Sequence, residues 1–368
     1  MKKKSKKLII TVILAMILVL AVFLPIPYYI EVPGSAQNIS QYIQVDNQTK
    51  KTANQDGTLM LVYIREMHAT PLSYAMSFLN PFADRDSAAD LYQGSNEKDY
   101  QTVQQYYMQD AINEAKYVAF KAAHKKVERK YLGLYVMSVM PNSSFKGKLH
   151  VGDTVESVNG KHFGDSQAYI NYIKGLPRGS KIKIGVLSGS KHKTLTGITK
   201  RLGDTQQYGI GITLADRTEV KTPIKVQANM DGIEGPSAGL MMSLQIYDDL
   251  THQNLLHGRK VAGTGTINAQ GQVGDIGGAD KKVVAASRTG ASIFFVPDNP
   301  IPSVIKKAYP DLQTNYQEAK KAAKKIHTKM KIVPVRTLIK HLSIWKKQNK
   351  EVEERRFDFI QSPFFFRS

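Results

Sequence analysis

The sequence predicts an α+β protein with a single N-terminal transmembrane helix and two folded domains outside the membrane. Three observations lead to this prediction. An uncharged apolar run lies close to the N-terminus, alternating segments separated by glycine turns occupy the middle of the 368 residues, and glycine-rich loops followed by helical spacing occupy the second half.

The apolar run defines the membrane-spanning part. An uncharged stretch at residues 8–24, continuing to Ile30, is long enough to cross a bilayer. It follows five lysines, which place the N-terminus in the cytoplasm: Lys2, Lys3, Lys4, Lys6 and Lys7. We expect a cytoplasmic basic end at 1–7, an anchor in contact with membrane lipid at 8–30, and the bulk of the protein outside the cell. A cleaved signal peptide is the alternative, because residues 34–36 form a small-residue site, but their distance from the run favours a retained anchor.

Composition narrows the class of partner. The chain has no cysteine, so an exported form would be stabilised without disulfides. Its formal net charge of +20 suggests contact with an anionic envelope or acidic peptides. Nucleic acid is not expected, because zinc-finger spacing and RNA-binding aromatic signatures are missing from the sequence. The nine histidines show no paired ligand spacing, and we expect neither a metal nor another cofactor.

Residues 31–126 form an extracytoplasmic N-terminal region with two recognisable elements. Residues 58–64 alternate like a strand, and residues 103–123 have helical spacing. The apolar segment 76–81 suits either protein core or the membrane surface, and core or loop packing is the expectation favoured here. The sequence pattern does not indicate on which of the two following domains these elements pack.

Residues 127–204 read as a small domain of alternating strands. A tight turn at Gly133 is expected to lead into a strand, and a second strand is expected to end on the Asn159-Gly160 turn. A short helix over Ser166–Lys174 precedes the alternating segment 181–186.

Ser237 is the strongest candidate nucleophile in the remaining segment, 205–345. Glycines at 232, 235 and 239 permit sharp turns, and Pro236 suits the first position of a helix whose apolar spacing continues to about Leu250. Ser237 would then lie at a helix N-terminus, where backbone N–H groups can stabilise an oxyanion. The alternative is that Ser237 only caps this helix.

A serine needs a base, and no histidine lies in a recognisable hydrolase motif. Lys282 follows Gly277-Gly278 and begins an apolar helical run, so that burial would lower its pKa and leave the amine neutral. Lys281 should face elsewhere on the same helix. The alternative is that both lysines face solvent.

These segments resemble the proteolytic domain of the Lon (endopeptidase La) family over residues 208–342. The resemblance rests on GPSAG at 235–239, on Gly277, Gly278 and Lys282 in the pattern GGxxxK, and on TGxI at 264–267. It implies a catalytic dyad of Ser237 and Lys282. Supporting roles fall to Thr264, Glu234, Gly235 and Pro236, with Glu234 standing where aspartate is usual. The phosphate loop of the ATPase module that ATP-dependent relatives carry is missing from the sequence, which implies ATP-independent activity.

The middle segment resembles a PDZ domain, a β-sandwich with short helices. Residues 132–134 stand where the carboxylate-binding loop of that family would be, and residues 151–153 and 158–160 match its bacterial form. The resemblance implies that a peptide adds as a strand at Leu132, Gly133, Leu134 and Tyr135. The alternative is a domain that serves only as a spacer.

Taken in order, the segments are similar to the membrane-bound PDZ/Lon-like serine proteases of low-GC Gram-positive bacteria. This implies an endopeptidase that cleaves secreted or envelope peptides, a signalling peptide among them, with a peptide or unfolded protein as substrate. A catalytically silent PDZ scaffold and a partner-activated protease are the alternatives. A homo-oligomer is expected by analogy with Lon rings. The tail at 346–368 is expected to be peripheral.

Overall fold

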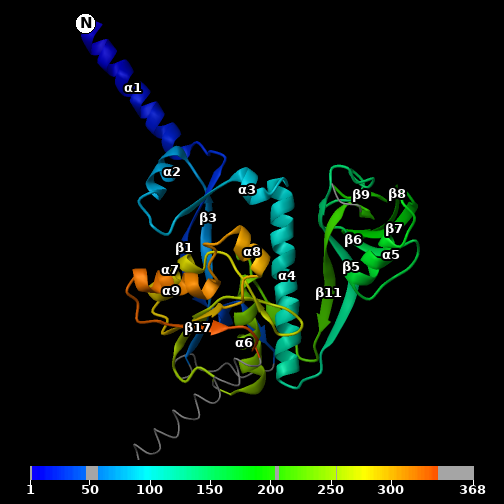
Figure 1. The fold of residues 1–368 in the computed structure, drawn as a ribbon. Helices are drawn as coiled ribbons and strands as arrows, with labels where there is room; N and C mark the ends of the chain where they lie inside the picture. The colour runs from blue at the N-terminus through cyan, green and yellow to red at the C-terminus, as the bar shows by residue number, and fades with distance from the viewer. Residues whose placement is uncertain (1, 47–56, 204–206, 254, 339–368) are drawn as a thin grey trace, which may run out of the picture.

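The computed structural model describes residues 2–46, 57–203, 207–253 and 255–338 (Figure 1). A long N-terminal helix projects from a body that contains two principal sheets, one of six strands and one of five. The predicted α+β class is confirmed. The C-terminal tail expected at 346–368 lies outside the described residues.

The N-terminal helix α1 spans Lys2–Phe23. It contains the one segment of the described chain that is long and apolar enough to cross a membrane, Lys6–Phe23, with a mean hydropathy of 2.5. The anchor was predicted to continue to Ile30, but the helix ends at Phe23. Pro25 and Pro27 follow the helix, and proline cannot continue a helix because it lacks the N–H donor. Residues from Tyr28 onward instead begin strand β1.

The six-stranded sheet combines the two ends of the described chain. Strands β3, β13, β16 and β17 run parallel to one another, whereas β1 is antiparallel to β3 and β4 is antiparallel to β1. In spatial order the strands are β17 (Lys331–Val335), β16 (Ile293–Pro297), β13 (Lys260–Gly263), β3 (Thr58–His68), β1 (Tyr28–Asn38) and β4 (Asp84–Ser87).

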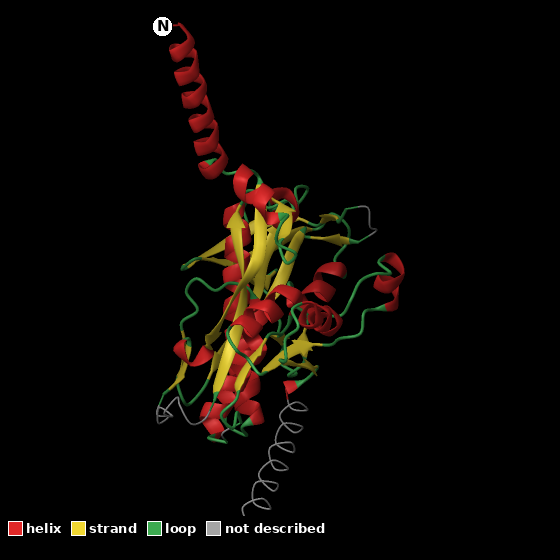
Figure 2. Ribbon diagram, turned by 90° about the vertical axis from the view of Figure 1, so that its left-hand side faces the viewer, coloured by secondary structure: helices red, strands yellow, loops and turns green. Residues whose placement is uncertain are grey.

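Both faces of this sheet are buried. Leu59 and Leu61 of β3 pack into a core with helices α4 (Glu97–Ala122) and α6 (Gly239–Thr251). The alternate residues Met60 and Val62 pack on the other side with α7 (Ala279–Arg288) and α9 (Asn315–Lys325). This alternation follows from the two-residue period of a strand. The result is a three-layer arrangement, and in Figure 2 helices lie both in front of the strands and behind them.

Residues 31–126 are therefore an integral part of the body that also contains Ser237 and Lys282. The strand expected at 58–64 continues to His68 as β3, and the helix expected at 103–123 begins earlier, at Glu97. The earlier start has a local cause, because the Asn96 side chain accepts a hydrogen bond from the Asp99 backbone N–H and caps the helix.

The second sheet is antiparallel and has its own core. Its order is β11 (Ile212–Lys221), β5 (Glu128–Val139), β6 (Thr154–Val158), β7 (Lys181–Ser188) and β8 (Lys191–Ile198). Helix α5 forms over Ser166–Lys174, as predicted, and its buried Tyr169 and Ile173 face the core. Because β11 lies beyond residue 204, this sheet includes chain on both sides of the expected domain boundary.

Helix α4 joins the two sheets. It packs against α6 on one side and against β11 on the other (Figure 1). The Tyr106 hydroxyl donates to the Asp216 carbonyl at 2.5 Å, and the Asn113 amide donates to the Thr218 carbonyl at 2.9 Å. The five-stranded sheet is therefore held against the larger body by hydrogen bonds to the backbone of one strand.

Core or loop packing was expected at 76–81, but the structure contradicts core packing. The segment includes the end of helix α2 (Pro71–Ser77) and the residues that follow. Met76, Phe78 and Leu79 are exposed, whereas Ser77 is buried. The remaining short elements are η1 (Ile39–Gln41), β2 (Ile43–Val45), α3 (Ala88–Tyr92), β9 (Lys200–Arg201), β10 (Tyr208–Gly209), β12 (Val226–Ala228), η2 (Pro236–Ala238), β14 (Thr266–Ile267), β15 (Val273–Gly274) and α8 (Ser303–Ala308).

The turn expected at Gly133 is instead a bulge inside β5. The pairing of β5 with β11 shifts register where Gly133 pairs with Arg217 and Tyr131 with Thr218. Gly133 has φ of +135°, and a Cβ there would lie 2.4 Å from the Val155 carbonyl oxygen. Glycine is required because the backbone conformation and the close approach both exclude a side chain.

Gly133→Ala is expected to destabilise the five-stranded sheet by about 2–4 kcal/mol, because it adds backbone strain and a steric clash. Gly147→Ala is the matched control, since Gly147 has φ of +76° but no atom within 4 Å of the added Cβ. Its expected cost is about 1 kcal/mol. Calorimetric melting of both variants measures the difference, and equal losses would contradict the bulge explanation.

Candidate active site

Ser237 lies where a glycine-rich loop enters the α6 layer. Gly235 has φ of +82°, which suits glycine, and it is followed by the short 3-10 turn Pro236–Ala238 and then by α6. Neither the turn nor α6 has a side-chain cap, so the interpretation of Ser237 as a mere helix cap is wrong. The Ser237 hydroxyl is instead directed into a pocket.

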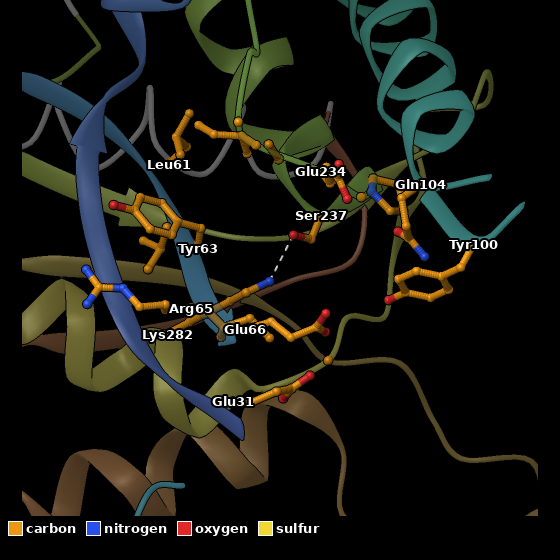
Figure 3. Close-up of a pocket in the computed structure, with 18 residues that line it drawn as sticks. Glu31, Leu61, Tyr63, Arg65, Glu66, Tyr100, Gln104, Glu234, Ser237 and Lys282 are labelled. Atoms are coloured by element: carbon orange, nitrogen blue, oxygen red, sulfur yellow. Dashed lines mark hydrogen bonds between the residues drawn. The ribbon is translucent and has the colours of Figure 1, made fainter. Parts of the chain in front are cut away.

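Lys282 reaches the same place from the opposite face of the sheet. It lies in the first turn of α7, where its backbone N–H donates to the Gly278 carbonyl at 3.0 Å. Its Nζ lies 2.9 Å from the Ser237 Oγ, and the two side chains point toward each other in Figure 3. Two helices on opposite faces of one sheet thus bring a hydroxyl and an amine into hydrogen-bond contact.

Thr264 holds both groups. It directly follows β13, and its hydroxyl lies 3.2 Å from the Lys282 Nζ and donates to the Ser237 backbone carbonyl at 3.1 Å. The Gly265 N–H donates to the same carbonyl at 2.8 Å. The position of Ser237 is therefore fixed by the chain that leaves the end of β13, and Thr264 is itself fully buried.

Burial lowers the pKa of Lys282 from 10.5 to about 8, against the smaller opposing influence of Glu31 and Glu318. Only 4% of the residue is exposed. Because desolvation penalises the charged form, a large fraction of this amine is neutral near pH 8. A neutral amine has a free lone pair that can accept the proton of the Ser237 hydroxyl.

Lys281 behaves in the opposite way. It is also buried, so the alternative of two solvent-facing lysines is wrong. Its ammonium pairs with Asp84, with Asp280 at 3.5 Å and with Glu31 at 3.8 Å. Burial alone would lower its pKa, but the hydrogen bond to Asp84 and the neighbouring carboxylates outweigh this and raise the pKa. Lys281 thus remains charged and ties α7 to β1 and β4.

The dyad opens into a cavity of about 580 Å³. One wall is residues 61–66 of β3, the opposite wall is the loop at 232–238, and Tyr100 and Gln104 of α4 close a third side (Figure 3). The predicted supporting residues Glu234, Gly235 and Pro236 all line this cavity. Past Leu61, β13 has ended, and no strand of the described chain pairs with that edge of β3.

Three carboxylates line the cavity, those of Glu31, Glu66 and Glu234, and they lie there with the basic residues Arg65 and Lys282. Burial, reinforced by the charges of Glu31, Glu234 and Asp86, raises the pKa of Glu66 to about 7. Burial likewise raises the pKa of Glu31, with Asp86 and Asp84 adding to the effect and Lys281 opposing it.

Sequence reasoning missed the contribution of the N-terminal region to this cavity. Glu31, Glu66, Tyr100 and Gln104 all precede residue 127. The available signal was the continuation of the 58–64 strand into charged residues, together with the Asn96 cap that starts α4 early. Neither signal indicates which distant segment the strand or the helix will contact.

The predicted peptide-binding segment of the PDZ domain is not at an open edge. Leu134 and Tyr135 pair with β6 on one side and with β11 on the other, and Gly133 also pairs with β11. Leu132 lies in the same interior strand, within the bulge. An added strand therefore has no place at Leu132, Gly133, Leu134 and Tyr135. The end strand of the sheet on this side is β11.

Comparison with known families agrees with the division into two modules. Residues 186–343 match the Lon protease (S16) C-terminal proteolytic domain, and residues 97–197 match the PDZ domain. The chain thus combines a PDZ domain, a Lon-type proteolytic domain and an N-terminal apolar helix. A proteolytic domain suggests peptidase activity, and the two domains together suggest peptide or protein substrates.

Two relatives share the proteolytic segment. Lon protease 2 of Herpetosiphon aurantiacus is 30% identical over 130 residues, covering 32% of this chain and 15% of the relative. The Lon protease of Desulforamulus reducens is 28% identical over 134 residues, covering 32% of this chain and 16% of the relative. The chain therefore matches less than a fifth of the length of either relative.

Two solved structures are similar to the PDZ part. The PDZ domain of an SdrC-like protein from Listeria monocytogenes is 34% identical, covers 23% of this chain and 90% of its own, and has a TM-score of 0.23. The corresponding domain from Listeria innocua is 32% identical, covers 22% of this chain and 92% of its own, and has a TM-score of 0.22.

Replacing each of the adjacent buried lysines by methionine is expected to change stability in opposite directions. Because the unfolded chain binds the Lys282 proton more tightly, its burial costs most below pH 8, and this cost fades as pH rises toward 10.5. Lys282→Met should therefore stabilise the protein at pH 7 by about 1–3 kcal/mol.

Lys281→Met is the paired variant. It leaves carboxylates without their cation and should destabilise the protein by about 1–3 kcal/mol. Thermal melting at pH 7 measures both variants. A loss of stability in Lys282→Met comparable to that in Lys281→Met would contradict the assignment of an uncompensated amine to position 282.

Proposed function

We propose that this protein is an ATP-independent serine endopeptidase whose catalytic dyad is Ser237 and Lys282. The observation that carries the proposal is the 2.9 Å contact between the Lys282 Nζ and the Ser237 Oγ at the base of a cavity. Burial of the lysine supports the role of base, and the Lon-type domain supports the reaction class.

In the proposed mechanism, neutral Lys282 accepts the hydroxyl proton as the Ser237 oxygen attacks the peptide carbonyl carbon. The carbonyl oxygen becomes an oxyanion, and backbone N–H groups near Ser237 would be its donors. Protonated Lys282 then gives its proton to the leaving amine, and an acyl-enzyme forms. Water hydrolyses this ester with Lys282 again as base. Thr264 keeps the amine aligned throughout.

The substrate would lie as an extended chain along β3. Residues 62–66 line the cavity beside the dyad, and their free edge offers backbone hydrogen bonds to an added strand. This mode of binding requires that the substrate segment be unfolded, because a folded strand already has its backbone groups paired. It suits a peptide or an unfolded protein segment.

The PDZ domain would hold substrate at β11 rather than at the segment predicted from sequence. Tyr106 and Asn113 of α4 donate hydrogen bonds to the Asp216 and Thr218 carbonyls of β11. Residues 212–215 of β11 precede this contact with α4 and are the part of the strand proposed to bind substrate. The alternating sequence Gly209-Ile210-Gly211-Ile212 enters this strand, and β10 contacts α5 beside it.

The apolar helix α1 would anchor the enzyme in the cell membrane, with the N-terminal lysines in the cytoplasm and the catalytic body outside the cell. Secreted or envelope peptides, including a signalling peptide, are then the accessible substrates. Burial of an uncompensated lysine against a serine would give a catalytically silent scaffold no benefit. Such burial costs stability and benefits only chemistry.

Cleavage of an unstructured peptide library by the purified protein without ATP tests the dyad. Ser237→Ala and Lys282→Ala should each reduce cleavage by roughly 10³-fold or more, because each removes a reacting group. Ser303→Ala and Lys307→Ala on exposed helix α8 are matched controls and should retain wild-type rates. Wild-type cleavage by Ser237→Ala would refute the proposal, as would library cleavage by none of the proteins even with candidate partners added.

The pH dependence of kcat/KM provides an independent test. Because only the neutral amine accepts a proton, the rate should rise with pH through an apparent pKa of about 8 and fall about tenfold per pH unit below it. Glu31→Gln should move this limb to lower pH, since Glu31 raises the pKa of Lys282. An unchanged limb in Glu31→Gln would contradict the assignment of the limb to Lys282.

A further inference from the structure

An exposed apolar surface surrounds helix α2. Leu72, Met76, Phe78 and Leu79 are exposed to 40%, 58%, 63% and 83%. We call these four residues the α2 foot. The sequence from Ala69 to Ala83 has no charged residue, although 22% of the whole chain is charged. Exposed apolar groups clustered on an uncharged segment are typical of an interaction surface.

The α2 foot lies at the point where α1 leaves the body. Helix α2 contacts α1, and Figures 1 and 2 both place short helical structure at the end of the body from which α1 projects. The attachment is fixed by backbone hydrogen bonds. The Ile26 N–H donates to the Ala69 carbonyl, and the Ala69 N–H donates to the Tyr28 carbonyl, both at 2.8 Å.

The segment that carries the foot also has buried residues on the side toward the body. Ala69, Ser77 and Ala83 are buried, and Ala69 and Ala83 form a small cluster with Ile30. The outward side chains have no covering element in the described part of the chain. Any partner must therefore approach from the side on which α1 projects.

The residues around the foot are those that favour a membrane–water boundary. The rings of Tyr28 and Tyr74 lie 5.0 Å apart, and Tyr74 contacts Phe78 at 5.5 Å. The Arg85 guanidinium lies 4.3 Å from the centre of the Phe78 ring and donates to the Ser77 carbonyl at 3.2 Å. Tyrosines and a guanidinium above an apolar tip match the arrangement of interfacial anchors.

We propose that the α2 foot inserts into the lipid bilayer interface beside α1, and that the bilayer is its partner. The proposal rests on the membrane attachment of α1 proposed above. An apolar helical face in this position would enter about 5–10 Å into the headgroup and acyl boundary. With α1 as one contact and the foot as a second, the body has a fixed tilt, and the cavity has a fixed height above the membrane.

The absence of cysteine from the sequence makes a direct test possible. Single cysteines would be placed in the full chain by Leu79→Cys, Met76→Cys, Leu14→Cys and Val304→Cys, and each would be labelled with a nitrobenzoxadiazole fluorophore. Val304 is the matched control, because it is 75% exposed on helix α8. Leu14 lies in α1 and reports the anchor.

The labelled proteins would be reconstituted into phosphatidylcholine and phosphatidylglycerol vesicles that contain doxyl lipids. We expect loss of emission at 79 and 76, more with a shallow doxyl group than with a deep one. The label at 14 should also be quenched, and the label at 304 should not. Retained melting temperatures and peptide cleavage verify that the exposed positions tolerate the label.

Three outcomes would overturn the proposal, and they are distinguishable. Quenching at 14 but not at 79 or 76 leaves the anchor intact and removes the foot from the bilayer. Emission at 79 that is shielded from water but unaffected by doxyl lipids assigns the surface to a protein partner or a second copy. Absence of quenching at 14 refutes the membrane anchor itself, independently of the peptidase assays.

Discussion

The arrangement of the body around the six-stranded sheet follows from one constraint, the burial of the Lys282 amine against the Ser237 hydroxyl. An amine in water is protonated at neutral pH and cannot act as a base. Removing water from it requires protein on all sides. The six-stranded sheet provides this because α6 and α7 cover opposite faces, and β13 ends early enough for the two side chains to meet around Thr264.

The same constraint explains why the two neighbouring lysines of α7 differ so strongly. Lys281 is surrounded by carboxylates from β1 and β4, and these compensate its buried charge. Lys282, one residue on, faces a hydroxyl pair and is not compensated. A rotation of α7 by one residue would exchange these environments, so the ion pairs of Lys281 also define which lysine reaches Ser237.

The sequence predicted the parts of the site that depend on local patterns. Ser237 and Lys282 each follow glycines that indicate a sharp turn before a helix, whereas Thr264 was implied only by the resemblance to Lon. The structure brings the three together. Helix α5 was predicted at about its observed position, and both its apolar spacing and the Asp165 cap that the structure shows are local features. Such features need no knowledge of distant contacts.

Features that depend on distant contacts could not be predicted in this way. The cavity residues Glu66 and Gln104 acquire their role only when β3 pairs with β13 and α4 packs on α6. Gly133 resembles a turn residue in sequence, and the Val155 carbonyl that explains it belongs to another strand. Segment 76–81 is apolar enough for a core, and only its place beside α1 distinguishes it.

The pairing of β3 with β13 also determines when the protein can fold during synthesis. Thr58 of β3 cannot pair until Lys260 of β13 has been synthesised, so the N-terminal strands emerge long before their partner strand exists. The strands of the PDZ domain lie closer together in the chain. Pairing between distant segments is slow, because loop closure precedes any gain from contacts. The contact between Ser237 and Lys282 cannot form until residue 282 is made, so a growing chain that ends before it lacks the proposed dyad.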